Sequence, residues 1–197
     1  YMSNIFIISA PSGCGKTSLL KELCQTYSFL TQTISYTTRD IRYGEVNGSD
    51  YHFISTETFI NKKNNNEFIE SQQVYNNYYG TSYKSIENIL ASGKDAILEI
   101  DYKGMLLIKS KIPSSRSIYI LPPSIEDLEK RLIERGLDSE DVIYNRVSKA
   151  HEELKYAKFA DYIVVNDNFS VASKSLKSII LHSKIDQKSL YNHTISP

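Results

Sequence analysis

Residues 9–20, SAPSGCGKTSLL, hold glycines, a lysine and a hydroxyl side chain at a spacing that suits the binding of a phosphate chain. Glycines in such a loop let successive backbone N–H groups line a concave anion site at the start of a helix. In this sequence those glycines are Gly13 and Gly15. The next residue, Lys16, can reach the β- and γ-phosphates of a nucleotide, and Thr17 can help to hold Mg²⁺. The spacing therefore predicts a nucleotide-binding loop.

One position departs from the usual pattern, because Ala10 stands where the first glycine of such a loop is expected. Alanine is tolerated there if its backbone φ angle is negative. A chance glycine-rich turn before a helix is the alternative interpretation. The apolar run at residues 4–9 favours a phosphate loop instead, since such a loop follows a buried strand.

The composition makes several classes of protein unexpected. Lys and Arg together number 23, as do Asp and Glu, so the net charge is zero and gives no general attraction to nucleic acid or to an anionic membrane. The chain of 197 residues suits one domain. No apolar run approaches the ~18 residues of a membrane span and no signal peptide is recognised, so we expect a soluble, cytoplasmic protein.

The two cysteines, Cys14 and Cys24, do not suggest a disulfide scaffold and fit a reducing compartment. Cys14 lies inside the predicted loop, where a small residue is needed. Alternatively, the helix N-terminus lowers the pKa of its thiol and makes it oxidisable. Cys24 lies on the apolar stripe of the following helix and is expected in the core.

Strand-like and helix-like segments alternate along the chain. Strands are expected at residues 4–9, 96–100, 117–121 and 162–165. Helices are expected over residues 16–27, 56–64, 125–135 and 171–183, from a Ser82 cap to Gly93, and from Asp138 or Ser139 to about residue 155. This alternation predicts an α/β fold with a mostly parallel central sheet covered on both faces.

Residues 34–55 have a different character, with strand-like stretches on both sides of Asn47-Gly48, a dipeptide typical of β-hairpins. We expect a small, mostly antiparallel insert there and a turn at residues 64–66. The tail from Lys184 onward is polar and is expected to lack order.

Polar residues follow the predicted parallel strands at their carboxyl ends, the edge at which α/β proteins bind ligands. The phosphate loop, Asp101, Pro122-Pro123 and Asn166-Asp167 all fall at such ends. This convergence predicts a ligand site at that edge.

Blocks of sequence outside the loop resemble those of guanylate kinases in order and spacing, from about residue 4 to residue 181. They are SYTTRDIRYGEVNGSDYHF (35–53), NNNEFIE (64–70), NYYGTS (77–82), AILEIDYKG (96–104), LPPSIEDLEKRLIERG (121–136) and YIVVNDNF (162–169). Ala10 itself resembles a variant found within that family. The resemblance implies transfer of the γ-phosphoryl group of MgATP to GMP, with dGMP as a further substrate, in purine nucleotide metabolism and GMP recycling.

The resemblance also implies a three-layer P-loop fold with an inserted small mixed β subdomain and a helical lid. The implied parts are a core of residues 1–33, 84–123 and 156–184, a GMP-binding subdomain of residues 34–83, a lid of residues 124–155 and a polar tail of residues 185–197.

For the phosphate of GMP, the resemblance implies a grip by Arg39 and Arg42, whose forked guanidinium groups suit that geometry. The hydroxyls of Tyr51 and Tyr79 would add hydrogen bonds to it. The implied GMP-binding residues are Ser35, Thr38, Arg39, Arg42, Tyr51, Glu70, Tyr79, Gly80, Thr81 and Asp101.

For the base, the resemblance implies that Glu70 accepts the N1–H and 2-amino donors of guanine, which adenine lacks as a pair. Ser35, Thr81 and Asp101 would assist it. A buried carboxylate left unpaired by the wrong base is costly, so discrimination of roughly 10⁴-fold is reasonable. The alternative for Glu70 is a solvated surface charge. Asp101 contacts guanine directly or orders water around Mg²⁺, and the sequence leaves both open.

For ATP, the resemblance implies that Arg135 and Arg146 of the lid close on the transferred phosphate. The implied catalytic residues are Lys16, Arg42, Arg135 and Arg146. The implied ATP-binding residues are Ala10, Pro11, Ser12, Gly13, Cys14, Gly15, Lys16, Thr17, Ser18, Arg131, Asn166 and Asp167, with Asn166 and Asp167 beside the adenine. Alternatively, Arg131 and Arg135 form a solvated face paired with Asp127 or Glu134, and Asn166-Asp167 is an ordinary turn.

Two rival functions remain from the sequence. The first is a guanylate-kinase-like module that binds phosphorylated peptides without catalysis, although such modules typically lose the loop or the lid arginines. The second is a kinase of another nucleoside monophosphate, which the Glu70 block and residues 39–51 argue against.

Overall fold

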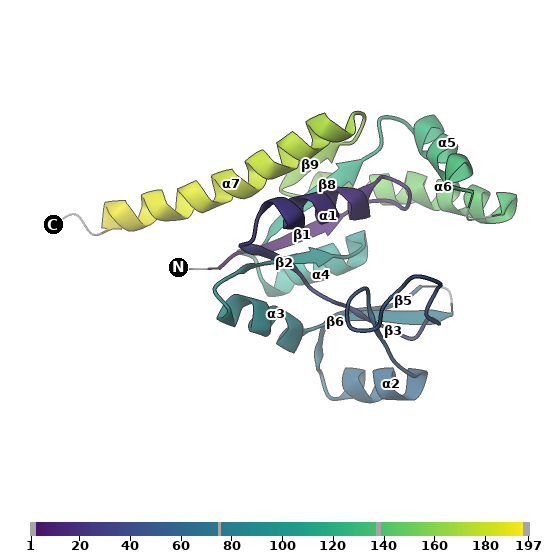
Figure 1. Cartoon of the computed structure of the whole chain (residues 1–197), viewed down its shortest axis with the longest axis horizontal. Coiled ribbons are helices and arrows are strands. Elements are labelled where there is room, and N and C mark those ends of the chain that lie inside the picture. The colour runs from purple at the N-terminus through teal and green to yellow at the C-terminus, as the bar shows by residue number, and fades with distance from the viewer. Residues whose placement is uncertain (1–2, 75, 137–138, 195–197) are drawn as a thin grey trace. The chain divides into compact units, whose positions relative to one another are not determined.

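The structure is a computed structural model that describes residues 3–74, 76–136 and 139–194, with side chains described as far as Lys184 (Figure 1). The chain divides into two compact units. Unit 1 comprises Ser3–Ile7 and Phe29–Arg116, and unit 2 comprises Ile8–Ser28 with the chain from Ser117 onward.

The larger sheet has five strands in the order β2-β7-β1-β8-β9, in which β1 (Ile5–Ser9) precedes the predicted phosphate loop. The pairs β2–β7 and β8–β9 are both parallel. The strand bounds are Leu30–Gln32 for β2, Asp95–Glu99 for β7, Arg116–Leu121 for β8 and Tyr162–Val165 for β9. The predicted α/β fold with a parallel central sheet is therefore confirmed, while β2 had no prediction from the sequence.

The smaller sheet belongs to unit 1 and has the order β4-β3-β6-β5. Its strands are β3 (Tyr36–Thr37), β4 (His52–Phe53), β5 (Phe68–Val74) and β6 (Asn77–Ser82). The pairs β3–β6 and β5–β6 are antiparallel. The expected Asn47-Gly48 hairpin is wrong, because β3 pairs with β4 in parallel.

The Asn47-Gly48 dipeptide instead turns the chain locally within a loop. Gly48 has a φ of 80° and its N–H donates to the carbonyl of Tyr51 over 2.8 Å. The hairpin of this sheet is formed by β5 and β6. Their half-exposed positions carry polar side chains, so the two strands lack the clear apolar alternation by which a hairpin is recognised in a sequence.

The helices of unit 1 are α2 (Thr56–Asn64), α3 (Tyr83–Ala91) and α4 (Tyr102–Lys111). The predicted Ser82 cap is confirmed, since the Ser82 hydroxyl accepts the N–H of Ser85 over 3.1 Å. Helix α4 was not predicted. It begins directly after Asp101, and an Asp101 carboxylate oxygen accepts the N–H of Gly104 over 2.9 Å.

The helices of unit 2 are α1 (Lys16–Thr26), α5 (Ile125–Arg135), α6 (Glu140–Leu154) and α7 (Phe169–Thr194), with a short 3₁₀ turn η1 (Ala157–Phe159). Glu22 of α1 accepts hydrogen bonds from Ser173 and Lys177 of α7, which joins these two helices. None of the helices among the described residues is long and apolar enough to cross a bilayer.

The start of α6 and the end of α7 can be compared with the boundaries predicted from the sequence. Ser139 is the N-cap residue of α6, whereas the alternative cap Asp138 lies outside the described residues. The expectation that order is lost after Lys184 is wrong as far as Thr194, because α7 continues to that residue. Polar composition did not prevent the helix from propagating through these turns.

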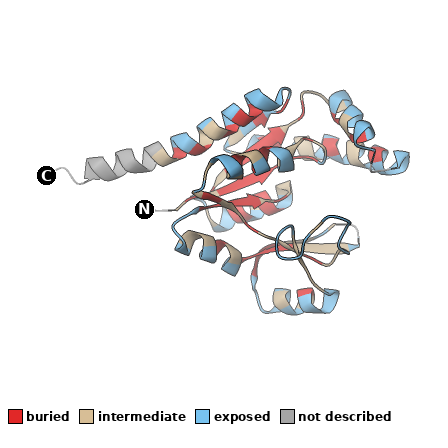
Figure 2. Cartoon of the chain, viewed as in Figure 1, coloured by how far each residue is buried: buried red, intermediate tan, exposed pale blue. Residues whose placement is uncertain are grey.

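The cores consist of the strands and the inward faces of the helices (Figure 2). Phe6, Ile97 and Ile120 are fully buried members of the central strands, and Leu20 is fully buried on α1. Cys24 is half-buried, so its predicted place in the core is only partly realised. These buried strands hold the loops at their carboxyl ends in fixed positions.

Candidate functional site

The predicted site residues fall into two sets, and each set lies within one unit. The residues assigned to ATP and to the lid belong to unit 2, and those assigned to GMP belong to unit 1.

The loop between β1 and α1 has the backbone of a phosphate-binding turn. Gly13 and Gly15 have φ angles of 92° and 81°, and Gly15 is the N-cap residue of α1. Among the described residues, Asn66 is the one non-glycine with a positive φ, so Ala10 meets the condition set for it. Lys16 and Thr17 therefore begin the helix where its N-terminus favours an anion.

Neither loop glycine has room for a side chain. A Cβ at Gly13 would lie 2.9 Å from atoms of both Leu128 and Leu132 of α5, and a Cβ at Gly15 would lie 2.6 Å from Nδ2 of Asn166. Backbone conformation and packing thus require glycine independently at these two positions.

The thiol of Cys14 is almost fully buried, and its burial raises its pKa to about 12. The positive charges of Arg131 and Lys16 oppose this shift without overcoming it. The thiol is therefore protonated at neutral pH, which supports the small-residue interpretation of Cys14 over the oxidisable one.

The arginines predicted on the two helices α5 and α6 have different partners in the structure. Arg146 of α6 donates to the Ser12 hydroxyl over 3.2 Å, which brings α6 to the phosphate loop. Arg131 of α5 donates to the carbonyl of Asn166 over 2.9 Å. Arg135 is exposed in the last turn of α5 and makes no hydrogen bond or ion pair with another described residue.

The alternative of a solvated basic face on α5 is wrong for Arg131, because its partner is backbone of another element. The two acids proposed as its partners are otherwise engaged. Asp127 accepts a hydrogen bond from Ser124, and Glu134 pairs with Lys130.

In unit 1, aromatic side chains surround Arg39, one of the two arginines predicted to bind the GMP phosphate. Its guanidinium carbon lies 5.7 Å from the ring centroid of Tyr51 and 5.6 Å from that of Phe53. The rings of Tyr51 and Tyr79 meet edge to face, with centroids 6.1 Å apart. Arg42 lies on the exposed loop beyond β3.

Glu45 is a partner of both arginines that the sequence did not single out. Its carboxylate accepts two hydrogen bonds from Arg39, of 2.7 and 3.1 Å, and the backbone N–H of Arg42 over 2.8 Å. The hydrogen bonds from Arg39 hold the pKa of Glu45 below its usual value. Because both residues lie in a loop, no helical or strand periodicity in the sequence could have identified Glu45 as the partner of Arg39.

The predicted guanine reader is a buried carboxylate at the end of a chain of hydroxyls. Glu70 is 4% exposed, and its Oε1 accepts the hydroxyl of Thr81 over 2.7 Å. The hydroxyls of Ser35 and Thr81 are 3.1 Å apart. Since Thr81 donates its one proton to Glu70, Ser35 is the donor in that second bond. The solvated-charge alternative for Glu70 is therefore wrong.

Burial raises the pKa of Glu70 to about 7, and the nearby carboxylate of Asp101 adds to the shift, while the hydrogen bond from Thr81 opposes it. The second oxygen of Glu70, Oε2, lies on the side of Gly104, where a Cβ would come within 3.4 Å of it. The carboxylate of Glu70 therefore lies near that of Asp101, and its Oε2 lies beside Gly104, which has no side chain.

Two of the residues assigned to GMP have structural contacts of their own. The Thr38 hydroxyl accepts the N–H of Tyr78 over 2.9 Å, joining the loop after β3 to β6. A Cβ at Gly80 would lie 3.1 Å from the ring of Phe59 and 3.2 Å from that of Phe68, so glycine is needed there for packing.

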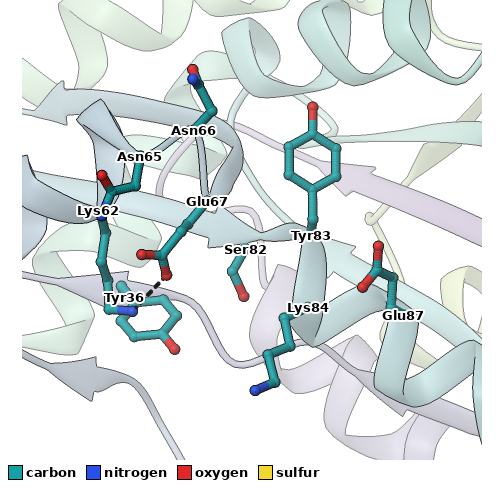
Figure 3. Close-up of a pocket in the computed structure, with 9 residues that line it drawn as sticks. All are labelled: Tyr36, Lys62, Asn65, Asn66, Glu67, Ser82, Tyr83, Lys84 and Glu87. Carbon is teal, nitrogen blue, oxygen red and sulfur yellow. Dashed lines mark hydrogen bonds and ion pairs between the residues drawn. The ribbon is translucent and has the colours of Figure 1, made fainter.

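A hollow of about 380 Å³ in unit 1 lies apart from these residues (Figure 3). It is lined by Tyr36, Lys62, Asn65, Asn66, Glu67, Ser82, Tyr83, Lys84 and Glu87. Lys62 and Glu67 form an ion pair of 2.8 Å within its lining, and none of the predicted site residues lines it. It is not part of the substrate site described above.

The residues present fit an Mg²⁺ ion that arrives with a nucleotide. No group of three or more His, Cys, Asp or Glu within the part of the chain that is described could hold a metal ion. Mg²⁺ commonly keeps several waters and is bound by phosphate oxygens with one or two protein oxygens. Thr17 at the start of α1 is a hydroxyl residue that suits this role beside the phosphate loop.

The comparisons with known proteins agree with one another. The family model of guanylate kinase matches residues 2–183. The guanylate kinase of Hydrogenovibrio crunogenus is 48% identical over 181 residues, which cover 92% of this chain and 88% of that protein. That of Blochmanniella floridana is 46% identical and covers 99% of this chain and 95% of that protein.

A solved structure gives the same answer at the level of fold. The crystal structure of guanylate kinase from Anaplasma phagocytophilum matches with a TM-score of 0.73 and 28% identity, covering 92% of this chain and 86% of that one. On sequence and structure together, the chain belongs to the guanylate kinase family.

Proposed function

We propose that this chain transfers the γ-phosphoryl group of ATP to GMP through the two sets of residues described above, giving ADP and GDP. The observation that carries the proposal is the chain Ser35–Thr81–Glu70, which holds a buried carboxylate with one oxygen fixed by a hydroxyl. A guanine base presents two adjacent N–H donors that such a carboxylate accepts together.

In unit 1, Arg39 and Arg42 bind the phosphate of GMP, and the hydroxyls of Tyr51 and Tyr79 donate to it. Their gathering around one guanidinium group supports these roles. Asp101 assists Glu70 at the base, and the electrostatic influence of its carboxylate on Glu70 supports this role.

In unit 2, the backbone N–H groups of residues 13–17 bind the phosphates of ATP, and Lys16 holds the phosphates near the transferred group. Arg146 stabilises the charge that develops on that group, and Arg135 joins it. The contact of Arg146 with Ser12 supports this role, since it brings the guanidinium to the loop.

Mg²⁺ bound with ATP supplies positive charge to the phosphate oxygens, and the hydroxyl of Thr17 is the protein oxygen that holds it. Phosphoryl transfer depends mostly on positioning and charge stabilisation. Lys16 and the arginines are therefore expected to contribute more to the rate than any proton transfer.

The non-catalytic alternative, a module that binds phosphorylated peptides, is not favoured. The relatives reported above carry the name guanylate kinase, and the loop has the backbone conformation that a phosphate requires.

The test is an assay of ADP formation from MgATP run separately with GMP, AMP, UMP and dTMP. We expect robust turnover with GMP and at least about 10³-fold less with the others, since none of them offers Glu70 the adjacent pair of N–H donors that guanine has. Equal turnover with AMP would remove Glu70 as the base reader. Lack of turnover with every acceptor, while GMP still binds, would support the non-catalytic module.

A further inference from the structure

Asn166, directly after β9, is buried and reaches back to the phosphate loop. It is 5% exposed, and its side-chain Nδ2 donates to the carbonyl oxygen of Cys14 over 2.7 Å. Both residues belong to unit 2, although 152 positions separate them in the sequence. The amide N–H of Asn166 is therefore bonded to the backbone of the phosphate loop, which is a different role from contact with the adenine base.

The position of this amide also accounts for one of the loop glycines. A Cβ at Gly15 would lie 2.6 Å from Nδ2 of Asn166, so the amide occupies the volume that a side chain would need. At Gly13 a Cβ would lie 2.9 Å from atoms of both Leu128 and Leu132. The loop is therefore held between α5 and Asn166.

Asn166 is itself held on both sides. Its backbone N–H donates to the carbonyl of Leu121 at the end of β8 over 2.8 Å. Its carbonyl accepts the guanidinium of Arg131 over 2.9 Å. The backbone of Asn166 is thus held by β8 and by α5, and both contacts are made within the protein.

The hydrogen bond to Cys14 fixes the direction of a peptide group. In a planar trans peptide the C=O of one residue and the N–H of the next point in opposite directions. Holding the carbonyl of Cys14 toward Asn166 therefore turns the N–H of Gly15 away from it. Aligned N–H groups in such a turn form the anion site.

We propose that Asn166 is a positioning residue of the phosphate loop, which fixes the Cys14–Gly15 peptide in the orientation that binds phosphate whatever base the nucleotide carries. This inference deepens the proposed function, on which it rests, by assigning Asn166 to the phosphates rather than to the adenine.

The test compares Asn166→Asp and Asn166→Ala with wild type, using ATP and ITP as phosphoryl donors and inorganic tripolyphosphate as a binding probe. Aspartate keeps the shape but presents an acceptor to the carbonyl of Cys14. We expect KM to rise about tenfold for both donors and tripolyphosphate binding to weaken by a similar factor, with GMP affinity unchanged.

Each other result overturns the assignment. A loss confined to ATP, with ITP and tripolyphosphate unaffected, would make Asn166 a reader of adenine. A fall in kcat with unchanged donor KM and a lower melting temperature would mean a structural role only. If wild type lacks kinase activity, tripolyphosphate binding still decides the role of Asn166 by itself.

A double-mutant cycle with Gly15→Ala tests the contact itself. Gly15→Ala should weaken donor binding strongly, and part of that loss should disappear in the Asn166→Ala background, where the clash at Nδ2 is gone. Strict additivity would show that the two residues do not act through each other. The matched control is Asn168→Ala, whose side chain caps α7 by accepting the N–H of Val171, and which should leave donor KM unchanged.

Discussion

The two sets of residues that we propose for phosphate and for nucleoside are built by different means. In unit 2 the phosphate loop relies on backbone, with two glycines at positive φ, packed so closely that neither has room for a Cβ. In unit 1 the site relies on side chains, and charged groups already have protein partners, as Glu45 does with Arg39.

The difference follows from what each part must distinguish. A phosphate chain looks the same on every nucleotide, so a rigid array of N–H groups is sufficient to bind it. A purine base is distinguished by its pattern of donors and acceptors, which calls for a carboxylate in a buried position. Such burial is unfavourable for the charge, and the raised pKa of Glu70 reflects this.

The largest effect is expected from a substitution in the phosphate loop of unit 2, which should leave the residues proposed for GMP intact. Lys16→Ala should lower kcat by at least about 100-fold, because the positive charge on the ATP phosphates is lost from the transition state. GMP affinity, measured by calorimetry without ATP, should remain near wild type, since the GMP residues lie in unit 1. Lys21→Ala, an exposed lysine of the same helix, is the control, and near-normal turnover of Lys16→Ala would remove Lys16 from the mechanism.

The same contrast explains how far the sequence could predict the molecule. Backbone motifs are local, so the loop, the flanking strand and helices α2 and α5 were predicted with nearly their observed bounds. The apolar runs of the central strands also identified the parallel sheet.

Side-chain partnerships are not local, and the sequence did not reveal them. The bond from Asn166 to Cys14 spans the fold, and the Arg39–Glu45 pair sits in a loop without periodicity. The Asn47-Gly48 signal was misleading, because β3 forms its antiparallel pair with β6 rather than with β4. Glu70 was identified through resemblance, since its burial depends on the packing of β5, α4 and β6.

The next prediction removes the base reader. Glu70→Gln should raise KM for GMP about 100-fold, since an amide replaces one acceptor oxygen by a donor that faces the donors of guanine. KM for ATP should change by less than about threefold. Glu67→Gln, at a partly exposed glutamate directly before the same strand, is the control. Equal losses for both substrates would make Glu70 a structural residue.

The melting temperature of Glu70→Gln shows whether the variant has lost guanine recognition or has lost folding stability. The pKa of Glu70 is raised from 4.5 to about 7, so the carboxylate costs the folded state stability as pH rises through that window. The amide does not titrate there. Glu70→Gln should therefore melt at a higher temperature than wild type at pH 8, and a lower one would show that the substitution damages the fold.

A smaller effect is expected from pH itself. With a pKa of about 7, Glu70 is mostly ionised at pH 8 and mostly protonated at pH 6. Only the carboxylate accepts both guanine donors, so KM for GMP should rise about tenfold between pH 8 and pH 6. The GMP phosphate also titrates, with a pKa of about 6. Glu70→Gln supplies the correction, since its profile keeps the phosphate titration alone. Identical profiles in the two proteins would refute the role of Glu70 ionisation.

The smallest expected effect concerns Glu45, which orients Arg39 while neutralising part of its charge. Glu45→Gln removes the charge and one acceptor but keeps the shape, so Arg39 becomes less fixed and more available to phosphate. These consequences oppose each other, so we expect a small net effect, although the two paired side chains are only 13% and 21% exposed. We expect KM for GMP to rise by about threefold, with kcat nearly unchanged and with Glu87→Gln as the exposed control. A fall in KM instead would mean that Glu45 competes with the phosphate for Arg39. In that case the ion pair would weaken phosphate binding rather than orient Arg39 for it.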